Sequence, residues 1–107
     1  MTDQSQQLLS QAALYQQQMQ GIAAQKEALN MQLMEISSAL DELEKTASKE
    51  VYKIAGPLIL KSDREEVQKD MAEKKELIHT RLQVLEKSEH KIKTKVDELR
   101  ERLTKAG

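Results

Sequence analysis

The sequence predicts a mainly α-helical chain, a long antiparallel coiled-coil hairpin whose central β-hairpin joins an oligomeric β-barrel body. Apolar residues recur about every 3.5 residues on both sides of the middle of the chain, as in coiled coils. Residues 51–61 hold the only Pro and a run of aliphatic side chains without helical spacing. The chain has 107 residues, 33% of them charged, with no Phe or Trp, which disfavours a compact core. We expect one domain over residues 1–107.

The first helix is predicted over residues 5–48. Its apolar positions step by four and three from Leu8 onward, and Lys26 is the one polar interruption. Gly21 is a weak point, because Gly costs about 1 kcal/mol relative to Ala inside a helix. The predicted seam consists of Leu8, Ala12, Tyr15, Met19, Ile22, Lys26, Leu29, Leu33, Ile36, Leu40, Leu43 and Ala47.

The first 25 residues differ from the rest of this helix. They contain a single charged side chain, Asp3, and nine Gln. They also carry apolar residues beside the seam, namely Leu9, Ala13 and Leu14. Two interpretations remain open: a frayed, Gln-rich end, or an adaptable apolar surface that repacks around varied partners.

The second helix is predicted over residues 63–104. Ser62 or Asp63 is a suitable cap, and Glu65 and Glu66 follow in the first turn. A second seam comprises Met71, Lys75, Ile78, Leu82, Leu85, Glu89, Ile92, Val96, Leu99 and Leu103. Leu77 and Val84 widen the apolar face beyond this seam, which suggests packing against something besides the first helix.

Antiparallel pairing of the two seams admits registers that differ by seven residues, and the turn selects among them. The selected register pairs Leu8 with Leu103 and Leu40 with Met71. It places Lys26 and Glu89 in adjacent layers, where polar residues fix register at some cost in stability. In the selected register the two helices are symmetric about residues 55–56, which are therefore the predicted loop of the β-hairpin. The turn type is left open. It pairs Val51 with Leu60, Tyr52 with Ile59, and Lys53 with Leu58.

The β-hairpin, predicted over residues 50–61, is apolar on both faces. One face carries Val51, Leu58 and Leu60, and the other carries Tyr52, Ile54 and Ile59. Two isolated strands are marginal in water, and their outer edges would be open. Other chains must therefore supply strands, most economically by closing a barrel.

Several classes of function are disfavoured. His79 and His90 have no metal-binding or catalytic spacing, and no phosphate-binding loop is present. Residues 87–107 carry seven basic and four acidic side chains, interleaved and without stacking aromatics, so we expect no nucleic-acid partner. The net charge is −1, and no apolar run reaches membrane-spanning length. We expect no enzyme, no cofactor, no metal and no membrane partner. The absence of Cys and of a signal peptide fits a cytoplasmic protein.

Residues 51–66, VYKIAGPLILKSDREE, resemble the beta-type subunits of the prefoldin family, most closely the archaeal form. The segments EKKELI at 73–78 and TRL at 80–82 continue the resemblance, which spans residues 6–103. It implies a hexamer of two alpha-type and four beta-type subunits. It also implies that the hairpins form a double β-barrel body, in which we expect the subunits to assemble through Val51, Tyr52, Ile54, Leu58, Ile59 and Leu60.

The resemblance also implies a chaperone that captures non-native proteins without ATP and delivers them to a group II chaperonin. Coiled-coil tips would hold the client through Leu8, Leu9, Ala12, Ala13, Leu14, Tyr15, Met19, Leu99 and Leu103. Basic residues nearby, Lys95, Arg100, Arg102 and Lys105, are candidates for electrostatic contact with client or chaperonin. The alternative is a structural coiled-coil adaptor or spacer without client-holding activity.

Overall fold

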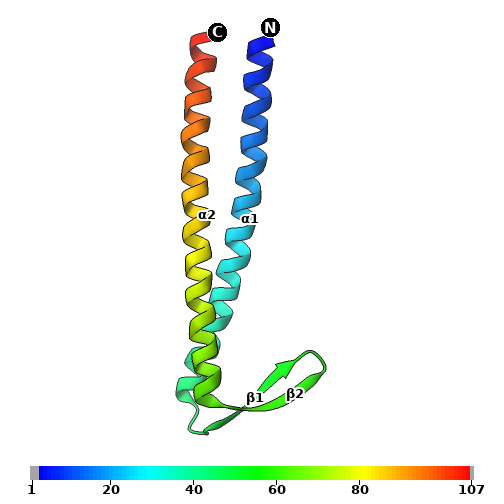
Figure 1. The fold of residues 1–107 in the computed structure, drawn as a ribbon, viewed down its shortest axis with the longest axis vertical. Helices are drawn as coiled ribbons and strands as arrows, with labels where there is room; N and C mark the ends of the chain where they lie inside the picture. Colours follow the sequence, from blue (N-terminus) through cyan, green and yellow to red (C-terminus); the bar gives the residue numbers. More distant parts are fainter. Residues whose placement is uncertain (1–2, 107) are drawn as a thin grey trace. The chain divides into compact units, whose positions relative to one another are not determined.

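The computed structural model describes residues 3–106 as two helices joined by a β-hairpin (Figure 1). The elements follow in the order α1 (Asp3–Lys45), β1 (Glu50–Ala55), β2 (Leu58–Asp63) and α2 (Arg64–Ala106). This confirms the predicted fold class. By itself the chain forms a two-stranded antiparallel hairpin, not a closed barrel.

The burial pattern confirms the two seams. Among the described residues the buried hydrophobic side chains are Leu8, Ile78, Leu82 and Leu99, and all four occupy predicted seam positions. The other seam residues within α1 and α2 are half-buried. Ala47 is the exception: it is exposed, because α1 ends before it is reached.

Contacts within the chain group it into two compact units. One unit joins α1 as far as Ala28 to α2 from Arg81 onward, and the other is Leu29–Thr80. In the first unit the two helical segments run antiparallel (Figure 1), and Lys26 Nζ lies 3.5 Å from Glu89 Oε2. The predicted proximity of these two side chains is therefore confirmed.

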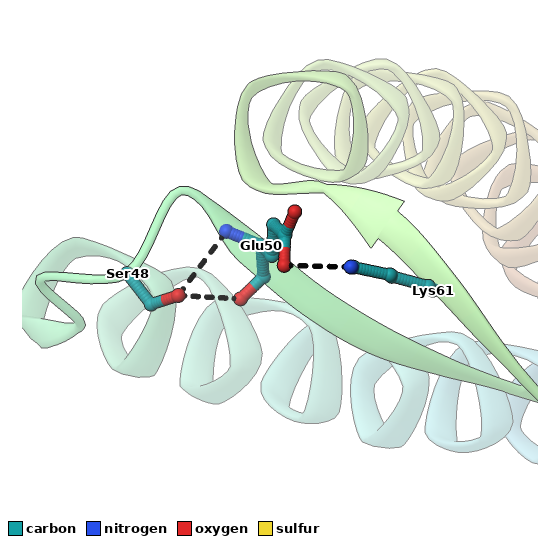
Figure 2. Close-up of polar contacts among 3 residues, drawn as sticks. All are labelled: Ser48, Glu50 and Lys61. Atoms are coloured by element: carbon teal, nitrogen blue, oxygen red, sulfur yellow. Dashed lines mark hydrogen bonds and ion pairs between the residues drawn. The ribbon is translucent and has the colours of Figure 1, made fainter.

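In the second unit, α1 ends at Lys45, three residues earlier than expected. Thr46 closes the last turn, because both its N–H (3.2 Å) and its hydroxyl (2.9 Å) donate to the Glu42 carbonyl. An irregular segment follows and leads into β1. There Ser48 Oγ accepts from the Glu50 N–H (3.2 Å) and donates to the Glu50 carbonyl (2.9 Å), as Figure 2 shows.

The exit from the hairpin is built differently from its entry. Strand β2 continues through Ser62 and Asp63 and passes directly into α2 at Arg64. The Arg64 N–H donates to the Lys49 carbonyl at 2.8 Å, and its guanidinium donates to the Thr46 carbonyl. One residue thereby holds the start of α2 against the segment that follows α1.

The predicted strand register is wrong by two residues. Val51 pairs with Ser62 rather than Leu60, and the loop is Gly56-Pro57 rather than residues 55–56. Gly56 has φ 59°, and Gly at the first central position suits a type II′ hairpin turn. The prediction assumed that the strands are centred on the same point of the chain as the two helices, and they are not. The irregular segment after α1 has no counterpart before α2, so the hairpin is centred further along the chain.

Candidate functional site

The hairpin exposes a set of apolar side chains that we term the hairpin surface: Val51, Tyr52, Ile54, Leu58, Ile59 and Leu60. Val51 is half-buried and the other five are exposed. The exposed fractions of Tyr52, Ile54 and Ile59 reach 72%, 77% and 70%. Such a cluster is unusual for a protein that functions as a monomer, because large exposed apolar patches mark interaction sites.

The two faces of the hairpin are divided as predicted, because a register shift of two leaves every side chain on its original face. On one face Ile54 lies directly opposite Ile59, with Tyr52 next along the strand. An ion pair closes the base of this face, with Lys61 Nζ 3.0 Å from Glu50 Oε2 (Figure 2). On the other face Lys53 lies opposite Leu60, and Ala55 lies opposite Leu58.

The hairpin also offers backbone hydrogen-bonding groups. In the described part of the chain the sheet contains only β1 and β2, so each strand has one edge without a strand partner. An open strand edge is a template for pairing with another chain. The hairpin surface thus combines two apolar faces with two strand edges whose backbone groups can form directional hydrogen bonds.

A second apolar surface, which we term the tip surface, lies within the unit formed by the beginning of α1 and the end of α2. Its members are the nine predicted client-binding residues, and the structure brings all nine into this unit. Leu8 and Leu99 are buried in the seam, whereas Ala12, Tyr15, Met19 and Leu103 are half-buried. Leu9, Ala13 and Leu14 are exposed.

The exposed members of the tip surface are the ones off the seam. The exposed fractions of Leu9 and Leu14 are 45% and 53%, although α1 and α2 pack together beside them. These side chains are therefore available without any opening of the coiled coil. The seam members are covered to a greater extent and would be fully available only if the ends of the helices separated.

A groove of about 420 Å³ lies between the two helices at the tip surface. Ala12, Gln16 and Met19 line it from α1, and Val96, Leu99, Arg100 and Leu103 line it from α2. Gln16 and Val96 were not among the predicted site residues. The small side chain of Ala12 in the seam was the available signal, since a small residue facing large ones leaves unfilled volume.

Within residues 3–106, no three or more His, Cys, Asp or Glu side chains lie close enough together to hold a metal ion. Neither α1 nor α2, over the same residues, is long and apolar enough to cross a membrane. The notable features are therefore the two apolar surfaces, and both are suited to contact with other polypeptides.

Comparison with known proteins agrees with this organisation. A family model described as "Prefoldin subunit" matches residues 6–106. "Prefoldin subunit beta" of Thermococcus onnurineus is 38% identical over 104 residues, which cover 96% of this chain and 90% of that protein. The protein of the same name from Archaeoglobus fulgidus is 33% identical over 101 residues, covering 94% and 87%. The crystal structure of the prefoldin beta subunit from Thermococcus strain KS-1 matches with a TM-score of 0.90 at 36% identity. That match covers 98% of this chain and 93% of the other.

Proposed function

The chain belongs to the prefoldin family of chaperone subunits, and from that premise we propose that it holds unfolded proteins without ATP. In this proposal the tip surface binds the client, and the assembled protein delivers it to a group II chaperonin. The role is non-enzymatic and needs no cofactor. We place it in the cytoplasm, in keeping with a chain that has no Cys.

The observation that carries the proposal is the exposure of Leu9 and Leu14 in a nearly uncharged segment. Asp3 is the only charged residue among the first 25, so the part of the surrounding surface that α1 contributes is Gln-rich and neutral. An apolar surface that is not surrounded by a fixed hydrogen-bonding pattern can bind many different apolar segments. Because Leu9 and Leu14 are already about half covered, a client that covers either one gains less than the about 1.5–3 kcal/mol of a fully buried Leu, so binding stays reversible.

The hairpin surface supports the second half of the proposal, which is assembly. Prefoldin membership implies assembly with other prefoldin subunits. We propose a hexamer of two alpha-type and four beta-type subunits, in which the hairpins of neighbouring subunits extend one another into a double β-barrel. The two open edges and the exposed Tyr52, Ile54 and Ile59 are the features that such pairing would cover.

The test is suppression of aggregation of a chemically unfolded protein by the purified chain, with and without an alpha-type prefoldin subunit. We expect protection that does not depend on nucleotide and that increases when the alpha-type subunit is added. Removal of residues 1–19 should weaken protection while leaving assembly intact. Equal protection by the truncated hexamer would contradict the assignment of the tip surface.

The adaptor alternative is an outcome of the same test. A structural spacer would bind specific folded partners and would have no affinity for denatured chains. If the intact hexamer of the unmodified chain does not suppress aggregation at all, the adaptor is favoured. Transfer to the chaperonin is tested separately, by recovery of native client when group II chaperonin and ATP are added afterwards.

A further inference from the structure

Four basic side chains flank the seam of α2 where it lines the tip surface. Between the seam residues Ile92 and Leu103, the positions on either side of the seam are Lys93, Lys95, Arg100 and Arg102. All four are exposed. In coiled coils, charges at these flanking positions commonly pair with opposite charges on the facing helix and set partner choice.

Here the facing helix supplies no opposite charge. The corresponding positions of α1 beside its seam are Leu9, Gln11, Gln16 and Gln18, and Asp3 is the only acid in the first 25 residues. The ion pairs among residues 3–106 are Lys26–Glu89 and Lys61–Glu50, and neither involves the four cations.

Acidic side chains do occur nearby on α2 itself. Asp97, Glu98 and Glu101 lie at outer positions of the helix, away from the seam, and none of them forms an ion pair with the four cations. Over residues 87–107, seven basic side chains outnumber four acidic ones. Both rims of the seam are thus cationic, and the anions face away from it.

The groove and the cationic rim are parts of one feature, because Arg100 itself lines the groove. Its other lining residues are mainly apolar, including Met19, Leu99 and Leu103. A segment lying in the groove would meet an apolar floor and, at its edge, Arg100, which forms no ion pair within residues 3–106. Charge complementarity therefore identifies an occupant that carries both apolar and acidic side chains.

We propose that the tip surface selects non-native polypeptide segments in which acidic residues accompany the apolar ones. This inference rests on the proposed client-holding function and names the class of client that it favours. The apolar floor supplies most of the affinity. The rim accelerates encounter with acidic segments and disfavours basic ones, which is how charges at the edge of an interface act.

The test compares two unstructured 20-residue peptides with identical Leu and Ile content, one with Glu and the other with Lys at the remaining charged positions. Fluorescence anisotropy measures their binding to the assembled protein. Each exposed ion pair is worth about a factor of two, so we expect the Glu peptide to bind about tenfold more tightly at low salt. The difference should vanish near 1 M salt, because exposed charges are then screened.

Two matched variants locate the effect. Arg100→Gln with Arg102→Gln removes two rim cations, and Lys87→Gln with Lys91→Gln removes two cations from outer positions of the same helix. The first pair should weaken binding of the Glu peptide about fourfold. The second should change it by less than about 1.5-fold, since these charges lie away from the groove. Gln retains helix propensity, and circular dichroism checks that all variants are folded.

The outcomes separate this inference from the proposed function. Binding of both peptides with equal affinity, unchanged in the rim variant, would overturn charge selection and leave client holding in place. Equal losses in the rim and outer variants would overturn the assignment to the groove. Failure of the unmodified assembly to bind either peptide or an unfolded protein would contradict the proposed function itself.

Discussion

The hairpin surface and the tip surface both expose apolar side chains, but their backbones differ. In the hairpin, β1 and β2 each have an edge without a strand partner. At the tip surface, Leu9 and Leu14 project from a helix whose peptide groups already bond within the helix. One surface thus offers directional backbone hydrogen bonds together with apolar contact, and the other offers contact through side chains alone.

Under the proposed function, this difference accounts for how one short chain would combine a fixed partner with variable ones. Strand pairing demands a register and a matching edge, so it selects a defined partner. A helical surface has no such demand, and its side chains repack around many sequences. We therefore expect changes to the hairpin surface to alter assembly and changes to the tip surface to alter client binding.

The largest effect is expected from Ile59→Lys. Ile59 is 70% exposed in the single chain and would be covered in the assembly, where an unpaired buried charge costs several kcal/mol. Sedimentation velocity at a fixed concentration should show the hexamer replaced by smaller species. Met34→Lys is the control, because Met34 is 71% exposed on the outer side of α1, away from its seam. A hexamer that tolerates Ile59→Lys would remove the hairpin surface from assembly.

A smaller effect, on backbone geometry alone, is expected at the two described glycines. Gly56 has φ 59° and Gly21 is helical, and an added Cβ would meet nothing within 4 Å at either position. Gly56→Ala should destabilise by about 1–2 kcal/mol, because L-residues are strained in the left-handed region. Gly21→Ala should stabilise by about 1 kcal/mol. At equal protomer concentration, the midpoint temperature of thermal unfolding should fall for Gly56→Ala and rise for Gly21→Ala. Shifts of the two midpoints in the same direction would contradict the assigned turn.

The smallest effect is expected at Lys26 and Glu89. The pair is half-buried with a 3.5 Å separation, so its coupling energy should be about 0.5 kcal/mol. A double-mutant cycle with Lys26→Met and Glu89→Met measures it from denaturant unfolding. The double variant should be at least as stable as the original chain, because apolar packing replaces a desolvated pair. Strictly additive single changes would show that the pair contributes nothing to the register.

The seams were predictable from the sequence because a heptad pattern restricts which side chains lie inside. Leu8, Ile78, Leu82 and Leu99 are buried where the spacing placed them, and Lys26 meets Glu89. The strand register was not predictable by symmetry. It depends on where α1 ends and on the turn, and the bonds of Thr46 and Ser48 that shape that segment leave no periodic signal.

The tip surface was predictable only in part. The heptad spacing separated the buried Leu8 and Leu99 from the exposed Leu9, Ala13 and Leu14, but only the resemblance named the nine residues as client-binding. The groove depends on the three-dimensional gap beside Ala12 and so includes Val96 and Arg100. The charge pattern around it was visible in the sequence, but its relation to the groove required the structure.

The central claim is that assembly and client holding use separate surfaces, and one measurement tests it directly. Leu9→Gln with Leu14→Gln alters exposed positions off the seam, and Met31→Gln with Met34→Gln alters somewhat more exposed positions elsewhere on α1. In suppression of aggregation by the assembled hexamer, the first variant should lose about fivefold in protective potency, as expected from about 1 kcal/mol of lost apolar contact. The second should protect as the original chain does, and both should remain hexameric. Equal protection by both variants, or disassembly of the first, would contradict the claim.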